Sequence, residues 1–307
     1  MIRALLFAVF LFIQLQVKMA GKLVIIVTGA NKGIGFEVVR KLAKEANNSF
    51  LAKELGTQGA TIYLTARDEA RGQAAYNKLA NLSNDSTDIQ YATLDVSSPD
   101  SVRKFKDLIS SKHEQVHALI NNAGVSPAVA GDGGSWDSKT IEWVLSVNYY
   151  GVREMTNAFL PMMHDQGRIV NLSSGLAKLS ALRDRRLKER FQKASKVSQV
   201  DELMQEFKDG VRDGTYGSKG WPRLSYTVSK VGLVGLTRAF AAEQSITHPK
   251  LLVNYVEPGW VTTDMGGGWA SDGDAKDGAV SPSFAAVGDL KGKSGIGISK
   301  DSKETSW

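Results

Sequence analysis

The 307-residue sequence contains no cysteine and only four histidines. The absence of cysteine excludes disulfides, thiolate metal sites and a cysteine nucleophile. It does not decide in which cellular compartment the protein resides. His113 and His117 fit the H-E-x-x-H pattern of zinc enzymes, which needs both imidazoles on one continuous helix and a third ligand. The second histidine abuts a predicted strand, and His164 and His248 lie in unrelated contexts. We interpret the pair as the solvated end of a helix and expect no metal.

The sequence also lacks a long apolar run and a basic stripe with interleaved aromatics. The run Ala4 to Ile13 has the length of a signal peptide, follows Arg3, and is too short to span a bilayer comfortably. No small-x-small cleavage site is evident, and Met19 is an alternative start. We expect residues 1–20 to be a leader or tail of a cytoplasmic protein, with secretory or membrane-associated targeting left open. The net charge of +6 without a basic stripe favours an anionic cofactor or substrate over nucleic acid.

Short apolar runs alternate with helical patterns through the rest of the chain. This alternation is typical of a doubly wound parallel sheet (Rossmann-type α/β fold), whose site lies at the carboxyl ends of the strands. We expect residues 21–307 to form a single domain of this kind. The expected strands are 23–27, 61–64, 88–94, 118–120, 168–172 and 251–256, with a weak seventh around 296–298.

Four segments between these strands have less regular patterns. Residues 45–59 are expected as a helix extension or surface excursion, and a long amphipathic pattern runs from about 138 to 166. The charged stretch at about 178–222 is interpreted as an insertion with two amphipathic helices forming a solvated lid. Beyond Gly266 the chain is rich in Gly, Asp, Ser and Lys, and we expect a loose loop over the site.

The sequence Thr28–Gly35 (TGANKGIG) follows the first predicted strand and opens a helical pattern. Glycines let the backbone turn tightly and approach a pyrophosphate, whose charge lies at the helix N-terminus. The alternative is a flexible glycine turn, but the strand before and the helix after favour a dinucleotide site. The predicted cofactor contacts here are Gly29, Asn31, Lys32, Gly33, Ile34 and Gly35.

The end of the second predicted strand carries Arg67, where an NAD site usually offers an acidic residue to the ribose. Together with Lys32, Arg67 suits a 2′-phosphate and therefore NADPH; the alternative is that it begins a solvated helix, and Asp68 weakens the inference. Asp95, followed by Val96, ends the third predicted strand. Its carboxylate is expected either to bind an adenine amino group or to cap the next helix.

Tyr226 and Lys230 are four residues apart and therefore lie on one face of a helix. A free phenol has a pKa of about 10, and a cation nearby lowers it. The pair is thus a candidate for general acid–base work on an alcohol or carbonyl oxygen. Alone the pattern is weak, because a surface helix with an extended lysine has the same spacing.

These motifs occur in the order TGANKGIG, NNAG, Asn148, a serine after the fifth strand, YTVSK and PGWVTT. In this order they resemble the short-chain dehydrogenase/reductase family over roughly residues 22–265. The insertion before Tyr226, which ends in Gly220-Trp221-Pro222, is similar to that of the monomeric carbonyl reductase branch. The resemblance implies a monomer, because the insertion covers the surface through which related tetramers associate.

The resemblance also implies roles for the site residues. Tyr226 protonates the carbonyl oxygen, Ser174 (preferred to Ser173) hydrogen-bonds the same oxygen, Lys230 holds the ribose and lowers the pKa of Tyr226, and Asn148 supports a water relay to Lys230. Asn122, Ala123 and Gly124 flank the adenosine ribose. In the loop after the sixth strand, Pro258, Gly259, Val261 and Thr263 are expected to contact the cofactor, with Val261 and Thr263 orienting the nicotinamide, and Trp260 to contact the substrate.

The implied activity is the NADPH-dependent reduction of ketones, aldehydes or quinones. Two alternatives remain: an alcohol or steroid dehydrogenase working toward oxidation, and a catalytically silent NADPH-binding regulator. An intact set of Ser174, Tyr226 and Lys230 argues against the silent regulator.

Overall fold

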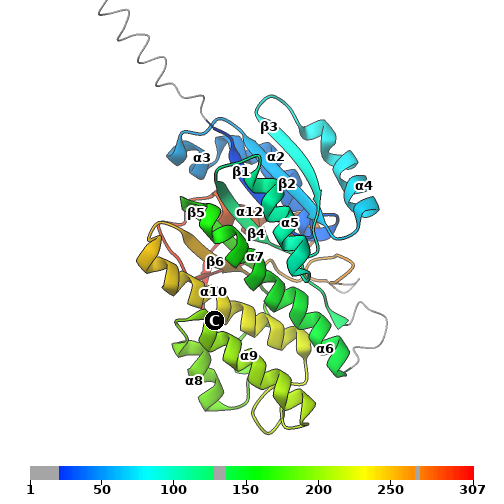
Figure 1. The fold of residues 1–307 in the computed structure, drawn as a ribbon, viewed down its shortest axis with the longest axis vertical. Coiled ribbons are helices and arrows are strands. Elements are labelled where there is room, and N and C mark those ends of the chain that lie inside the picture. The colour runs from blue at the N-terminus through cyan, green and yellow to red at the C-terminus, as the bar shows by residue number, and fades with distance from the viewer. Residues whose placement is uncertain (1–20, 128–135, 267–269) are drawn as a thin grey trace, which may run out of the picture.

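The computed structural model describes residues 21–127, 136–266 and 270–307, and these residues form a layered α/β fold around one sheet (Figure 1). The strand order is β3-β2-β1-β4-β5-β6-β7-β8, parallel except for the antiparallel pair β7–β8. The prediction of a doubly wound parallel sheet is confirmed. The strands are β1 (Leu23–Val27), β2 (Ala60–Ala66), β3 (Thr87–Thr93), β4 (Val116–Asn121), β5 (Met163–Leu172), β6 (Leu252–Val256), β7 (Gly297–Ile298) and β8 (Glu304–Thr305).

Each face of the sheet has its own apolar core, and β1 contributes to both because successive side chains of a strand point to opposite faces. Val24 and Ile26 belong to one core, whereas Leu23, Ile25 and Val27 belong to the other. Helices α5 (Pro99–Ser110), α7 (Val152–Phe159) and α10 (Ser225–Thr247) bury residues in the first core; α2 (Gly33–Glu45), α3 (Phe50–Leu55), α4 (Glu69–Leu79) and α12 (Val280–Val287) bury residues in the second. A strand buried on both faces is apolar along its whole length, as the sequence of β1 is.

The order of the strands decides where a site forms. β1 lies between β2 and β4, so the chain leaves β1 in one direction along the sheet and later returns to its other side. At such a switch point the loops at the carboxyl ends of the strands diverge and leave a crevice for a ligand. The loops after β1, β4, β5 and β6 all lie at this edge.

The amphipathic pattern at about 138–166 does not form one helix. α6 (Ser138–Leu145) continues through a π-helical turn, η4 (Ser146–Gly151), into α7, and a short 3₁₀ turn, η5 (Leu160–Met162), precedes β5. Pro161 lies in that turn. Proline cannot donate the backbone hydrogen bond that a continuing helix needs, so the helix ends before it and β5 begins earlier than expected.

Two helices lie in the segment 178–222: α8 (Arg185–Lys193) and α9 (Val197–Arg212). α9 lies alongside α10, the helix of Tyr226, as Figure 1 shows. Asp201 of α9 accepts a hydrogen bond from the Tyr149 hydroxyl at 2.9 Å and forms an ion pair with Arg153 at 2.8 Å. The insertion therefore covers the outer surface of α10 and η4.

The prediction of a loose loop beyond Gly266 is wrong for most of that segment. The chain forms the short helix α11 (Ala275–Gly278), then α12, which packs against α2, β4, β5 and β6, and finally β7 and β8. Ala285, Ala286 and Val287 of α12 are buried. Small residues allow this close packing, and their Gly- and Ser-rich surroundings concealed it in the sequence. Residues 45–59, by contrast, contain a short 3₁₀ turn and α3, as expected for a helix extension.

None of the helices in the described part of the chain is both long and apolar enough to cross a membrane. The expectation of a leader or tail at residues 1–20 lies outside the described residues.

Candidate active site

The glycine loop after β1 is locked to the loop after β4. Gly29 has φ of +62°, and a Cβ at this position would lie 2.8 Å from the Cα of Ala123, so only glycine fits. The amide Nδ2 of Asn122 donates to the carbonyls of Thr28 and Gly29 at 2.8 and 3.0 Å. The hydroxyl of Thr28 accepts from the backbone N–H groups of Asn122 and Ala123, both at 3.0 Å. Sequence reasoning gave Thr28 no role, although a hydroxyl residue directly before the first glycine is a usable signal.

The N-terminus of α2 is open to an anion. Lys32 occupies the N-cap position without a side-chain hydrogen bond to the helix, and the first turn contains no acidic residue. The free backbone N–H groups of a first turn and the helix dipole together favour negative charge there. A Cβ at Gly33 would lie 3.5 Å from Cγ2 of Thr263, so Thr263 in the loop after β6 lies beside the glycine loop, and its contact with the cofactor stays a prediction.

The second contact between these loops involves Ile34 and Val261. Both side chains pack against Gly278 of α11. A Cβ added at Gly278 would lie 2.9 Å from a side-chain carbon of Val261 and 3.0 Å from one of Ile34. Val261 is therefore held between the glycine loop and the C-terminal segment. The preceding residues Pro258 and Gly259 form the turn out of β6, with Gly259 at φ of +88°.

The two cations predicted for a 2′-phosphate differ in their surroundings. Arg67 directly follows β2, is exposed, and has no ion-pair partner within the described residues. Asp68 does not compete for it: its carboxylate caps α4 by accepting from the backbone N–H of Arg71 at 2.8 Å, and this bond lowers the pKa of Asp68. Lys32, by contrast, forms an ion pair with Asp264 at 2.5 Å.

Asp95 lies between β3 and α5 and does not cap the helix. Its Oδ1 accepts from the backbone N–H and the hydroxyl of Ser97 at 2.9 and 2.6 Å, whereas Ser98 is the N-cap of α5. Of the two alternatives for Asp95, helix capping is therefore wrong, and adenine contact stays a prediction. Val96 beside it is buried.

Ser174 and Tyr226 come together across the ends of β5 and α10. The Ser174 hydroxyl lies close enough to the phenol of Tyr226 to lower its pKa, and the Ser174 Oγ accepts a hydrogen bond from the backbone N–H of Leu176 at 3.2 Å. Ser173 is buried, and its hydroxyl has no hydrogen-bond partner among the described residues. Ser174, not Ser173, therefore faces the tyrosine. Tyr226 lies in the first turn of α10, and the structure thus places two hydroxyl donors side by side.

Lys230 lies one turn further along α10 and is 4% exposed. Its Nζ is 5.8 Å from the centroid of the Tyr226 ring and donates to the carbonyl of Leu172 at 2.6 Å. Burial lowers the pKa of Lys230 to about 8, and burial raises the pKa of Tyr226, an effect that the nearby Ser174 hydroxyl opposes. Burial and Ser174 are the causes of the Tyr226 shift, so the expectation that Lys230 lowers this pKa stays a prediction.

Asn148 lies in the π-helical turn η4 and holds the loop after β4. Its Oδ1 accepts from the N–H of Val125 at 2.8 Å, while Nδ2 donates to the carbonyl of Val125 at 2.9 Å and to the Ser229 hydroxyl at 3.1 Å. A Cβ at Gly124 would lie 3.5 Å from Asn148 Oδ1 and 3.8 Å from Lys230 Nζ. Asn148 therefore lies close to Lys230, with its side chain committed to protein partners; a water relay through this residue stays a prediction.

Exposed apolar side chains follow or precede the site residues. Leu176 and Leu224 are each 60% exposed and lie two residues from Ser174 and Tyr226, and Trp260 after β6 is 54% exposed. The Trp260 indole donates to the carbonyl of Gly266 at 3.0 Å, which fixes one edge of the ring. These side chains give the site an apolar border.

The histidines of the H-E-x-x-H pattern have structural partners instead of a metal geometry. His117 lies within β4, where it stacks on His164 at 5.2 Å between ring centroids and accepts from the N–H of Val24 at 3.0 Å. His113 is hydrogen-bonded to the Tyr63 hydroxyl at 2.8 Å. Interpreting the pair as a solvated helix end is therefore wrong. Among the residues that the structure describes, no three His, Asp or Glu side chains are arranged to hold a metal ion.

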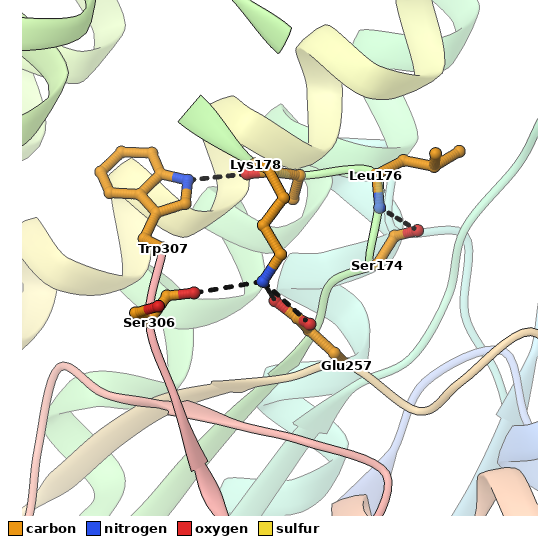
Figure 2. A network of polar contacts seen from close by, with 7 residues as sticks. Ser174, Leu176, Lys178, Glu257, Ser306 and Trp307 are labelled. Carbon is orange, nitrogen blue, oxygen red and sulfur yellow. Dashed lines mark hydrogen bonds and ion pairs between the residues drawn. The ribbon is translucent and has the colours of Figure 1, made fainter. Parts of the chain in front are cut away.

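One polar network next to the site has no counterpart in the sequence motifs. Lys178, four residues after Ser174, forms an ion pair with Glu257 at 2.9 Å and donates to the carbonyl of Ser306 at 3.1 Å (Figure 2). The Trp307 indole donates to the carbonyl of Ala177 at 2.7 Å. No spacing signal predicts contacts between residues that are 79 to 130 positions apart in the sequence.

Comparisons with known proteins agree with this geometry. The family model of the short-chain dehydrogenases matches residues 23–183. A relative from Mus musculus, carbonyl reductase [NADPH] 1, is 32% identical over 92% of this chain and 98% of its own length. A relative from Saponaria officinalis, short-chain dehydrogenase/reductase 1, is 33% identical over 80% of this chain and 84% of its own.

Among solved structures, salutaridine reductase from Papaver somniferum superposes with a TM-score of 0.75 at 26% identity, covering 90% of this chain and 99% of that one. The chain belongs to the short-chain dehydrogenase family.

Proposed function

We propose that this protein is an NADPH-dependent carbonyl reductase acting on ketones, aldehydes or quinones. The observation that carries the proposal is the neighbouring hydroxyls of Ser174 and Tyr226, with the ammonium of Lys230 beside them, at the sheet edge that also carries the glycine loop. The relative from Mus musculus is named a carbonyl reductase that uses NADPH, which supports the same assignment.

The residues present fit a dinucleotide. The turn at Gly29 leaves no room for a side chain, and the N-terminus of α2 carries neither a side-chain cap nor an acidic residue in its first turn. When bound, NADPH supplies the hydride that the carbonyl carbon accepts. Arg67, at the end of β2, has no ion-pair partner in the part of the chain that the structure describes, and we propose that it binds the 2′-phosphate and selects NADPH over NADH.

The protein's own contribution is made at the carbonyl oxygen. Negative charge develops there as the hydride arrives, and the hydroxyls of Ser174 and Tyr226 are two preplaced donors for it. Tyr226 transfers its proton to this oxygen, so the product is an alcohol. Because burial raises the pKa of Tyr226, the phenol stays protonated at neutral pH, which is the form that a reduction requires. Lys230 supplies positive charge near the phenol, and we propose that it also binds the ribose hydroxyls of the cofactor.

The substrate class follows from the border of the site. Leu176, Leu224 and Trp260 present exposed apolar surface there, which favours an apolar carbonyl compound over a charged sugar or acid. We also propose that the protein is a monomer, because α9 covers α10 and η4. A cytoplasmic location stays a prediction from the sequence, and cell fractionation tests it.

The function is tested by following NADPH oxidation by the purified protein with a panel of quinones, activated ketones and aldehydes. We expect turnover with apolar members and a lower KM for NADPH than for NADH. Efficient oxidation of alcohols with NADP⁺, but weak reduction of every carbonyl, would support the alcohol or steroid dehydrogenase instead. NADPH binding without turnover of any member would support the silent regulator.

A further inference from the structure

The loop that carries Ser174 is held from outside the site by Lys178, Glu257, Ser306 and Trp307, which we call the Lys178 clamp. Lys178 Nζ lies 2.9 and 3.3 Å from the two carboxylate oxygens of Glu257 and 3.1 Å from the carbonyl of Ser306. The indole N–H of Trp307 donates to the carbonyl of Ala177, one residue before Lys178, at 2.7 Å. Figure 2 shows these contacts converging on the segment that begins at Ser174.

The Trp307 ring also packs against two helices next to the site. The guanidinium of Arg238 lies 5.6 Å from its ring centroid, and the ring of Phe191 meets it edge-on at 6.0 Å. Arg238 belongs to α10, the helix of Tyr226 and Lys230, and Phe191 belongs to α8 of the insertion. Trp307 therefore connects the serine loop to the catalytic helix.

The clamp acts on Ser174 through a short, hydrogen-bonded stretch of backbone. The N–H of Ala177 donates to the carbonyl of Ser174 at 2.9 Å, and the N–H of Leu176 donates to its hydroxyl at 3.2 Å. A shift of Ala177 or Lys178 is thus transmitted to the Ser174 hydroxyl within one turn. On the other side, Glu257 directly precedes Pro258 and Gly259, so the ion pair also joins the serine loop to the loop after β6.

We propose that Lys178 and Trp307 are positioning residues for the reduction: they fix Ser174 relative to Tyr226 and to the loop after β6. This inference rests on the proposed function. The Lys178 side chain is 38% exposed, and ion pairs at this exposure contribute little to stability. Catalysis, however, is sensitive to misplacement of a donor by as little as an ångström. The clamp is therefore expected to affect the rate more than the folding.

The test uses three variants of the full chain and one control. Trp307→Phe keeps an aromatic ring against Phe191 but removes the indole N–H. Lys178→Met removes the positive charge at this position, whereas Lys178→Arg keeps it. Lys293→Met is the control, because Lys293 forms an ion pair with Glu304 in the same C-terminal segment and does not contact the serine loop.

We expect Trp307→Phe and Lys178→Met to lower kcat by roughly tenfold to a hundredfold. NADPH affinity should stay within about twofold, because neither residue lies in the cofactor site; Lys178→Arg should recover most of the rate, and Lys293→Met should match the unaltered protein. Independently of turnover, the amides of Leu176 and Ala177 should exchange hydrogen for deuterium faster in the first two variants, since both are hydrogen-bonded in the loop.

The outcomes separate the inference from the proposed function. An unaltered protein that reduces no carbonyl compound refutes the proposed function, whereas amide exchange still decides whether the clamp holds the loop. Full kcat and unchanged exchange in both Trp307→Phe and Lys178→Met overturn the inference, as does an equal loss in Lys293→Met. If Lys178→Met fails to fold, the rate and amide exchange of Trp307→Phe, measured against Lys293→Met, decide the inference.

Discussion

Among single residues, Tyr226 and Lys230 show how burial sets the chemistry of the site. Removal from water disfavours the charged form of each group, so the pKa of Tyr226 rises and that of Lys230 falls to about 8. At neutral pH the tyrosine is a proton donor, and the lysine is still mostly charged. This combination suits a reductase, which must give a proton to the substrate oxygen.

The depressed pKa of Lys230 predicts the alkaline side of the pH profile. Because the charged form predominates below its pKa, kcat/KM for reduction should fall as the pH rises through about 8. The measurement is kcat/KM for the carbonyl substrate at saturating NADPH, from about pH 6 to about pH 10. In Lys230→Arg, which keeps its charge, the alkaline decline should shift to higher pH even if the rate is low. A flat profile in the unaltered protein to the alkaline limit would contradict the assignment.

Arg67 should decide the choice between NADPH and NADH. A charge-assisted bond to a phosphate is worth about 1.5–3 kcal/mol, so Arg67→Ala should weaken NADPH binding by roughly tenfold to a hundredfold and leave NADH binding unchanged. Titration of protein fluorescence with each nucleotide measures this. Arg71→Ala is the matched control, because Arg71 lies four residues further along, in the first turn of α4, and is paired with Asp68. If Arg67→Ala weakened the binding of NADPH and of NADH equally, Arg67 would not be the residue that recognises the 2′-phosphate.

At the scale of elements, β4 and the segment after it show where local patterns mislead. The H-E-x-x-H spacing indicates one helix, yet His117 lies in β4 and supplies a hydrogen-bond acceptor to the N–H of Val24 in β1. The π-helical turn around Asn148 inserts an irregularity into a pattern that looks continuous, and such turns occur often at functional sites. Both features depend on neighbours far away in the sequence.

His117 should make the protein sensitive to acid. Burial lowers its pKa from 6.5 to about 4, so the neutral form is favoured by folding, and this stability is present above pH 6.5 and lost as the pH falls toward 4. The corresponding loss in the free energy of unfolding is on the order of 3 kcal/mol. His117→Asn retains an acceptor for Val24 but cannot be protonated. Urea unfolding across this range should show a smaller pH dependence in the variant; identical dependence would exclude His117 as the cause.

At the scale of the whole molecule, the sheet and the site follow from different kinds of information. Runs such as Leu23–Val27 are apolar because both faces of the strand are buried, so the sequence predicts the first six strands and the edge where the site lies. The glycine loop, Ser174, Tyr226 and Lys230 are predicted by motif order. Burial of α12, the antiparallel strand β8 and the Lys178 clamp cannot be predicted this way, because each is defined by contacts across the fold.

The assembly state is a prediction about the whole molecule. Val200, Leu203 and Phe207 of α9 are buried in the same core as α10, and we expect this cover to prevent association through α10. Light scattering after size-exclusion chromatography should give the mass of one chain, 33.2 kDa, at all protein concentrations tested. A mass that doubles or quadruples with concentration would contradict the monomer.

The most direct measurement of the central claim is the rate of hydride transfer in a single turnover, with enzyme and NADPH in excess over a reducible ketone, in Tyr226→Phe. Tyr150→Phe is the control, because it loses the same hydroxyl from a half-buried tyrosine that packs against Arg153 outside the site. If Tyr226 supplies the proton, its variant should still bind NADPH but transfer hydride at least about a hundredfold more slowly, with the control unchanged. A loss of less than about tenfold in Tyr226→Phe would show that another group protonates the carbonyl oxygen.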